Sequence, residues 1–406
     1  MPRLHYVSPS RHTKNNHPEK GGDMTGCNVA LQRAIACAWL SGLLLASGPA
    51  MAEPGVTDGK IVIGQTAGFT GPAGEQVQEM TQGAKLYLDA VNRAGGVNGR
   101  KIELISEDDG FDAGASKKHA HALLVDKQVF ALFLPRGTPN TEAIMTEARP
   151  RGAPVVAPST GASTFFDQPD PLLFVVRAKY QAEIAELVHY FDTLGLRRLA
   201  LVNVNDTFGK DTEIGFSNAT KKLPPNAHSI FTVDRLKPDI AKATADVGKF
   251  APQAVILACP GTTARAMIEA LNKQGTVTQI AALSNNAGLA FAKSLGALGR
   301  GVVISQVMPS PVRSTSLLGR ELASNAKAAG VAPSYAMMEG YAAARVLVEG
   351  LKRAGKSPTR AGFVAGLESA GTIDLGGLEV RYGPNLRKGS NYVELTVIGP
   401  NGTFVK

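Results

Sequence analysis

The stretch KIVIGQTAGFTGPAG, residues 60–74, joins a β-branched run to a glycine-rich loop and the start of a helical pattern. The run Ile61–Gly64 is typical of a buried strand, and the segment Glu75–Ala94 has the apolar spacing of an amphipathic helix. Gly95-Gly96 provides the glycine stop that helix C-termini favour. A strand followed by a short loop and a helix is half of a βαβ unit, so the stretch predicts a parallel sheet with helical crossovers.

The same alternation continues in two series. The first series adds strands near Ile102–Glu107, Val129–Leu134 and Pro154–Ala157, and helices near Asp112–Lys127 and Thr138–Ala148. The second series has strands near Arg198–Val204, Ser229–Val233, Ala254–Cys259, Thr278–Leu283 and Gly301–Gln306, with helices near Gln181–Gly195, Lys210–Lys222, Asp239–Phe250, Thr262–Gln274 and Leu289–Leu298. Helices near Ser316–Ala329, Tyr335–Ala354 and Thr359–Ser369 follow, and then strands near Leu378–Arg381 and Tyr392–Ile398.

The length of 406 residues exceeds the usual limit of one hydrophobic core. We therefore expect an α/β fold with two Rossmann-like lobes, each built on a parallel sheet. Ligand crevices in such sheets lie at the carboxyl ends of the strands, where the strand order reverses. Two sheets that face each other would form a cleft there.

The N-terminus has the pattern of an export signal. Arg33 precedes the apolar run Ala34–Ser47, and Ala50 and Ala52 occupy the small-residue positions before a cleavage site. The run has 14 residues, whereas a bilayer core requires about 20. We expect residues 1–52 to be a cleaved signal peptide with a preceding segment, translation to start at Met1 or Met24, and the remaining chain to be periplasmic.

Charge and cysteine content restrict the function classes. The formal net charge is +9, but no basic block of five residues occurs and the single Trp lies in the leader. This composition disfavours nucleic-acid binding. Cys259 is the only cysteine after the leader, which excludes an internal disulfide.

Two loops of the first series carry candidate binding residues. In Ala67–Gly74, which includes Phe69, glycines let backbone amides approach a ligand, although a tight turn is the alternative. Arg136-Gly137-Thr138 opens a predicted helix, where a carboxylate would meet free amides and the positive dipole end. The Thr138 hydroxyl equally suits a helix cap followed by Pro139 at the first helical position.

Two more loops follow predicted strands. Ser159-Thr160-Gly161-Ala162 offers two hydroxyls and a glycine for a small polar ligand, with a solvent-facing turn as the alternative. Asn205–Gly209 offers Asp206 as a partner for an ammonium group and Phe208 as an aromatic face. An Asx-type turn is the alternative there.

No motif indicates catalysis. Gly350–Ser357 fits the pattern G-x-x-x-x-G-K-S, but it ends a predicted helix instead of following a strand. His119 and His121 point to different sides of a helix, and the acids Glu107–Asp109 with Asp112 suit helix capping better than a cation site. We therefore expect no enzyme activity, no cofactor and no metal.

Four blocks resemble the leucine/isoleucine/valine-binding protein family: Lys60–Gly64, Thr70-Gly71-Pro72, Val91–Arg100 and Asp108–Asp112. The resemblance runs from about Val56 to the C-terminus. It implies a type I periplasmic binding protein, with lobes joined by three crossovers. Lobe 1 is then expected at 53–178 plus 308–388, and lobe 2 at 179–307 plus 389–406.

The resemblance also implies roles for site residues. Thr138 matches a hydroxyl position on the ligand carboxylate. Ser159 to Ala162 match a second carboxylate-binding loop, although Gly161 stands where a threonine is usual. Phe208 matches an aromatic position of the second lobe.

Departures from the family pattern concern the ligand. Amino-acid receptors of the family usually place an acid near Asn285-Asn286, which is uncharged here. Phe111 and Gly137 stand where some relatives have a disulfide. The resemblance therefore implies an organic carboxylate in place of an α-amino acid, with Arg136 as an additional counter-charge.

The combined expectation is a monomeric periplasmic solute-binding protein. It would bind an amino acid or carboxylate between its lobes and deliver it to an integral-membrane ABC permease. Two alternatives remain open: a ligand-sensing receptor of the same fold with a signalling partner, and a nucleotide-dependent doubly wound enzyme.

Overall fold

The computed structural model describes residues 53–275, 279–312 and 315–406. The predicted signal peptide lies outside these residues. Within the described ranges, no helix combines the length and the apolar character that crossing a bilayer requires.

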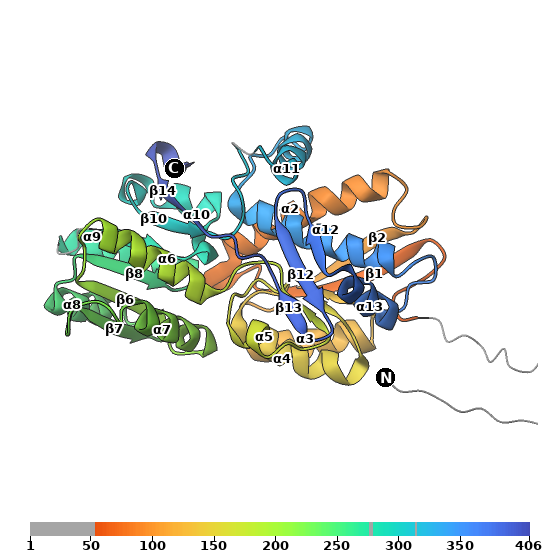
Figure 1. Ribbon diagram of the computed structural model, residues 1–406, viewed down its shortest axis with the longest axis horizontal. Coiled ribbons are helices and arrows are strands. Elements are labelled where there is room, and N and C mark those ends of the chain that lie inside the picture. Colours follow the sequence, from red (N-terminus) through yellow and green to blue (C-terminus); the bar gives the residue numbers. More distant parts are fainter. Residues whose placement is uncertain (1–52, 276–278, 313–314) are drawn as a thin grey trace, which may run out of the picture. The chain divides into compact units, whose positions relative to one another are not determined.

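The first sheet is parallel, with the strand order β2-β1-β3-β4-β5. Its strands are β1 (Lys60–Ala67), β2 (Lys101–Asp108), β3 (Leu132–Phe133), β4 (Val155–Val156) and β5 (Leu173–Phe174). Helix α2 (Gly74–Arg93) packs against α12 (Tyr335–Arg353), and α3 (Ala113–Val125) packs against α4 (Thr138–Ala148), and the two pairs cover opposite faces of the sheet (Figure 1). Seven of the eight residues of β1 are buried, because both faces are covered.

The second sheet has the strand order β15-β14-β10-β9-β8-β6-β7. Its strands are β6 (Leu199–Val204), β7 (His228–Val233), β8 (Ala254–Ala258), β9 (Gln279–Ala282), β10 (Val303–Gln306), β14 (Glu394–Ile398) and β15 (Phe404–Val405). Strands β7-β6-β8-β9-β10 are parallel and repeat the order of the first sheet, whereas β14 and β15 pair antiparallel. Helix α6 (Tyr180–Thr193) packs against α7 (Thr207–Ala219), and α8 (Ile240–Phe250) packs against α9 (Gly261–Gln274).

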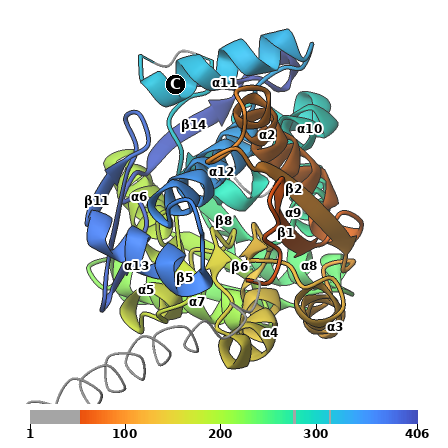
Figure 2. The same cartoon turned by 90° about the vertical axis from the view of Figure 1, so that its right-hand side faces the viewer.

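The remaining elements surround these sheets. An antiparallel sheet of β11 (Thr372–Asp374), β12 (Glu379–Gly383) and β13 (Leu386–Lys388) lies beside α13 (Arg360–Ala370) (Figure 2). Three more α-helices are α5 (Thr164–Asp167), α10 (Leu289–Ser294) and α11 (Leu317–Ala328). The short 3-10 helices are η1 (Gly71–Ala73), η2 (Arg149–Arg151), η3 (Ser284–Asn286), η4 (Gly296–Gly299) and η5 (Pro400–Gly402).

The chain passes between the two large sheets three times: after β5, after β10 and after β13. The expected two-lobed architecture with three connecting segments is therefore confirmed. We call the elements around the five-stranded sheet lobe 1 and those around the seven-stranded sheet lobe 2. The residue boundaries 178/179, 307/308 and 388/389 stay a prediction.

Most predicted helix ends are confirmed. Asp112 caps α3 by accepting a hydrogen bond from the Ala115 amide at 2.7 Å. Helix α2 ends at Arg93, and Gly95 follows with a φ of 99°. The motif Gly350–Ser357 begins in the last turn of helix α12, which ends at Arg353, and does not follow a strand. This position agrees with the rejection of nucleotide binding there.

The prediction that Thr138 caps α4 is wrong. Gly137 is the N-cap, with a φ of 101°, and Thr138 is the first helical residue. A glycine adopts this positive φ without steric cost, so the turn into the helix needs no side-chain cap. The Thr138 side chain is therefore available for another role.

Strand lengths differ from the prediction. Strands β3 and β4 pair over two residues each, and β5, β11, β13 and β15 were not predicted. Runs of two or three residues carry too little periodicity to distinguish a strand from a loop. Pairing with neighbouring strands decides these segments.

Candidate ligand-binding site

A cavity lies where the carboxyl ends of strands from both sheets meet. Lobe 1 lines it with residues that follow β2 and β3, and lobe 2 with residues that follow β6, β7, β8 and β9. The lining residues are Phe111, Arg136, Gly137, Thr138, Tyr180, Asp206, Phe208, Arg235, Pro260 and Asn285. The cavity volume is about 20 Å³, room for about one water molecule, which is far below the about 300 to 1,000 Å³ of small-molecule pockets.

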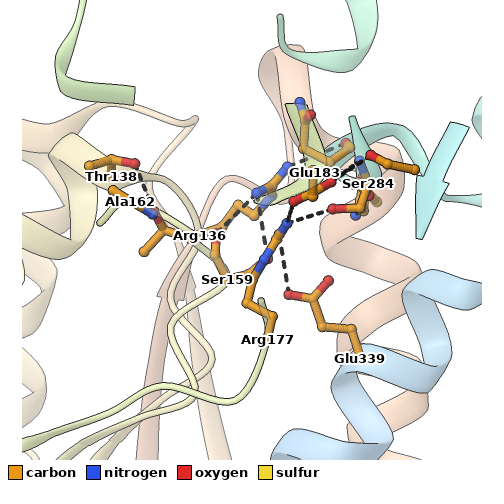
Figure 3. A network of polar contacts seen from close by, with 12 residues as sticks. Arg136, Thr138, Ser159, Ala162, Arg177, Glu183, Ser284 and Glu339 are labelled. Atoms are coloured by element: carbon orange, nitrogen blue, oxygen red, sulfur yellow. Dashed lines mark hydrogen bonds and ion pairs between the residues drawn. The ribbon is translucent and has the colours of Figure 1, made fainter. Parts of the chain in front are cut away.

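Arg136 is the charged group of the lobe 1 wall. It is 3% exposed, and its Nη1 donates to the Ser159 carbonyl at 3.0 Å (Figure 3). Its Nη2 donates across the lobes to the Asn285 carbonyl at 3.3 Å, while Nε has no hydrogen-bond partner. All three hydrogen bonds of this guanidinium go to carbonyl groups or a hydroxyl, and among the described residues no acidic side chain forms an ion pair with it.

Thr138 and Thr160 present hydroxyls at the N-terminus of α4. The two Oγ1 atoms are 2.7 Å apart, and both residues are buried. First-turn amides of a helix have no intrahelical acceptor and lie at the positive dipole end. This corner of the cavity therefore suits a negatively charged group.

The loop Ser159–Ala162 lies behind this corner and does not line the cavity. Thr160 Oγ1 accepts a hydrogen bond from the Ala162 amide at 3.3 Å. A Cβ on Gly161 would lie 2.7 Å from both the Ala178 carbonyl and the Tyr180 amide. The threonine that is usual in the family does not fit here, because the first connecting segment packs against Gly161.

The lobe 2 wall contains an internally satisfied acid. Asp206 accepts from the Gly209 amide at 2.9 Å as the N-cap of α7, and its Oδ2 pairs with Arg235 at 2.6 Å. Phe208 is buried, and its ring lies 4.7 Å from that of Tyr180. The acid that the sequence offers for an ammonium group thus already has a cationic partner.

Asn285 and Asn286 follow β9 in η3. Both side-chain amides donate to the Cys259 carbonyl, at 2.7 and 3.1 Å. Both Oδ1 atoms are buried without a hydrogen-bond partner, and of the two residues only Asn285 lines the cavity. Lobe 2 therefore presents a neutral amide where amino-acid receptors of the family usually have an acid.

Phe69 is not among the lining residues. It packs against a small apolar cluster that contains Phe111. A Cβ on Gly68 would lie 2.6 Å from the Phe111 amide, so the loop Ala67–Gly74 needs glycine for close packing. This geometry favours the tight-turn alternative.

Five lining residues were not predicted as ligand contacts: Phe111, Gly137, Tyr180, Arg235 and Pro260. The Arg235 guanidinium lies 4.0 Å from the Phe111 ring centroid and donates to Asn140 Oδ1 at 2.6 Å, so it links lobe 2 to lobe 1. Arg235 follows β7 as Arg136 follows β3. A search of the loops at the carboxyl ends of the predicted strands could therefore have found it. Phe111 has a φ of 67°, and a Cβ on Gly137 would lie 3.0 Å from its ring.

A family model described as periplasmic binding protein matches residues 60–402. The chain belongs to the periplasmic binding protein family. Within it, the chain is of type I, like leucine/isoleucine/valine-binding proteins. Members of this family are periplasmic proteins that bind substrates and are not enzymes.

Solved structures agree with this assignment. A substrate-binding periplasmic protein from Ralstonia solanacearum is 30% identical, with a TM-score of 0.79 over 85% of this chain and 99% of that chain. A possible leucine/isoleucine/valine-binding protein from Rhodopirellula baltica SH 1 is 24% identical, with a TM-score of 0.80 over 86% and 97%. A fatty acid ABC transporter substrate-binding protein from Thermomonospora curvata is 21% identical, with a TM-score of 0.77 over 89% and 95%. No curated protein sequence matches the chain.

Behind the cavity of this periplasmic binding protein lies a buried ionic network. Arg177, on the first connecting segment, donates to Glu183 of α6 and to Ser284, and its Nη1 lies 3.7 Å from Glu339 of α12 (Figure 3). Burial alone would lower the pKa of Arg177, but Glu339, Tyr180 and Glu183 together raise it. The network anchors the connecting segment to both lobes.

Neither metal binding nor thiol chemistry is supported. In the described part of this binding protein, no group of His, Cys, Asp and Glu side chains suits a metal ion. Cys259 is fully buried, and burial raises the pKa of its thiol. A buried neutral thiol of this kind is inert.

Proposed function

We propose that the protein is the solute receptor of an ABC importer and binds a small organic carboxylate between its lobes. The observation that carries this proposal is Arg136, a buried guanidinium without an acidic partner among the described residues. A buried charge without a counter-ion costs several kcal/mol. A ligand carboxylate would supply the missing negative charge and accept from the free Nε.

The surroundings of Arg136 support an anionic ligand. Thr138 stands beside it at the N-terminus of α4, with Thr160 in contact. Hydroxyl groups, helix amides and a guanidinium together can satisfy the several lone pairs of a carboxylate. Each such charge-assisted hydrogen bond contributes about 1.5 to 3 kcal/mol.

The ligand is proposed to be a carboxylate without an α-ammonium group. Asp206 is already paired with Arg235, and Asn285 is neutral. The lining residues therefore offer no free acid to an ammonium. This arrangement supports the expectation, based on the uncharged Asn285-Asn286 stretch, that the ligand is an organic carboxylate and not an α-amino acid.

Transport would follow from hinged closure. The ligand contacts residues of both lobes, so its higher affinity for the closed form drives closure around the connecting segments. Export through the predicted signal peptide, a monomeric state and delivery to a membrane permease belong to the same proposal. The relative from Thermomonospora curvata is described as the substrate-binding protein of an ABC transporter, which supports this role.

The test begins with a thermal-shift screen of residues 53–406 against amino acids, aromatic acids and dicarboxylates. Titration calorimetry then compares the best ligand with Arg136→Gln, for which we expect an affinity loss of about 10- to 100-fold. Arg149→Gln is the matched control, because Arg149 is exposed and pairs with Asp170 in lobe 1. Preferred binding of a cationic or neutral compound, or an unchanged Kd in Arg136→Gln, would contradict the proposal.

Import is tested separately in proteoliposomes that contain the partner permease. Uptake of the ligand should require both this protein and ATP. Ligand binding without uptake would favour the sensing alternative.

A further inference from the structure

Asn285 adds a second requirement to the ligand. Its Nδ2 donates to the Cys259 carbonyl at 2.7 Å, and a carbonyl can only accept, so the amide orientation is determined. The opposite atom, Oδ1, is a buried acceptor without a partner on a residue that is 5% exposed and lines the cavity. An unsatisfied buried acceptor of this kind is unfavourable, and a ligand donor would remove that cost.

The residue that carries this free acceptor contacts the anion-binding group through its main chain. Arg136 Nη2 is 3.3 Å from the main-chain carbonyl of the same Asn285, and Arg136 Nε is a free donor. Arg136 thus carries a free donor on a cation, and Asn285, which it contacts, carries a free neutral acceptor. Their complement is a ligand with a carboxylate and, on the adjacent carbon, a hydrogen-bond donor.

The charges of the cavity decide which donor fits. Two cationic residues, Arg136 and Arg235, and one anionic residue, Asp206, line the cavity. The lining therefore carries one positive charge in excess. A monoanion balances that excess, whereas a zwitterionic amino acid leaves it buried. A hydroxyl donates to Asn285 without adding charge, and an ammonium group would face two guanidinium groups.

We infer that the cavity selects 2-hydroxycarboxylates, with the carboxylate on Arg136 and Thr138 and the hydroxyl donating to Asn285 Oδ1. Phe111, Phe208 and Pro260 then cover the hydrocarbon part of the ligand. The inference rests on the proposed function, because it assumes the carboxylate site. It goes further by naming the ligand class and the residue that selects it.

The experiment compares ligands that differ only at carbon 2. One series is 2-hydroxy-4-methylpentanoate, 4-methylpentanoate, 4-methyl-2-oxopentanoate and leucine, and a second series has the 3-phenylpropanoate skeleton. Titration calorimetry on residues 53–406 should give the hydroxy acid about tenfold higher affinity than the unsubstituted and oxo acids. The amino acid should bind most weakly in each series.

Substitutions at Asn285 test the selecting residue. In Asn285→Ala, the affinity ratio of hydroxy to unsubstituted acid should fall to about one, because the acceptor is gone. Asn286→Ala is the matched control, since Asn286 makes the same contact with Cys259 but does not line the cavity, and it should retain the ratio. In Asn285→Asp, the ratio of amino acid to hydroxy acid should rise about tenfold, because the new carboxylate attracts the ammonium group.

The outcomes separate this inference from the proposed function. Equal binding of hydroxy and unsubstituted acids, tightest binding of the amino acid, or binding of other carboxylates alone overturns the inference and leaves carboxylate binding intact. Failure of every carboxylate to bind overturns both. Because the ligand series uses the unmodified protein, a variant that fails to fold does not decide the result.

Discussion

The Thr138 hydroxyl illustrates how much one residue's role depends on its neighbour. Its sequence context suits a helix cap, but Gly137 takes the N-cap position, and Thr138 Oγ1 instead contacts Thr160 Oγ1 at 2.7 Å. The hydroxyl is therefore held at the cavity wall by another hydroxyl, without competition from the helix amides. A hydroxyl placed in this way can donate to a ligand carboxylate.

Thr138→Ala is expected to weaken binding of the best carboxylate ligand about tenfold without unfolding the protein, because one charge-assisted hydrogen bond is lost. Titration calorimetry gives the Kd, and thermal unfolding checks the fold. Thr146→Ala is the control, since Thr146 is exposed on the same helix and its hydroxyl donates to the Ala143 carbonyl one turn before it. An unchanged Kd in Thr138→Ala would remove Thr138 from the site.

At the scale of elements, glycines determine how closely α2 and α12 pack. A Cβ on Gly340 would lie 1.8 Å from the Met80 carbonyl, and a Cβ on Gly83 would lie 2.0 Å from the Met337 carbonyl. Each helix thus has a glycine where the backbone of the other approaches. This contact also positions Glu339, which faces Arg177 from α12.

Gly340→Ala should lower the free energy of unfolding by about 1 to 3 kcal/mol or more, because the new methyl group overlaps the α2 backbone. Urea denaturation measures the change. Gly59→Ala serves as the control, since a Cβ there meets nothing within 4 Å and should leave stability nearly unchanged. An equal free energy of unfolding in Gly340→Ala and Gly59→Ala would show that α2 and α12 can move apart without loss of stability.

At the scale of the whole molecule, Arg235 is one of several residues that connect the lobes. It pairs with Asp206 in lobe 2, and it stacks on Phe111 and bonds Asn140 in lobe 1. The same residue lines the cavity, so lobe contact and ligand contact are coupled. Ligand release from a closed hinge requires these bonds to break.

Arg235→Ala is expected to raise the dissociation rate of the ligand about tenfold, since lost contacts act mainly on dissociation. The variant also leaves Asp206 without its cation, which further disfavours an anion. Stopped-flow displacement measures the rate. Arg198→Ala is the matched control, because Arg198 stacks at the same 4.0 Å on Phe250 within lobe 2, and a similar acceleration in both variants would argue against a clamp.

The sequence by itself determined the order of the longer elements, the two similar series and the loops that hold most of the site. These features depend on near neighbours: β-branched runs, apolar spacing and glycine stops act over a few residues. Arg136, Thr138, Asp206 and Phe208 were found in this way, and Asn285 through the family resemblance; all five line the cavity.

Only the tertiary structure decided which charges are paired. Asp206 and Arg235 are separated by 29 residues along the chain, and Arg136 and Asn285 by 149. No local pattern shows that Asp206 is already paired with a cation, or that the guanidinium of Arg136 has no acidic partner among the described residues. The balance of charge in a cavity depends on which strand ends meet, because side chains in a low-dielectric interior are satisfied by contact and not by proximity in sequence.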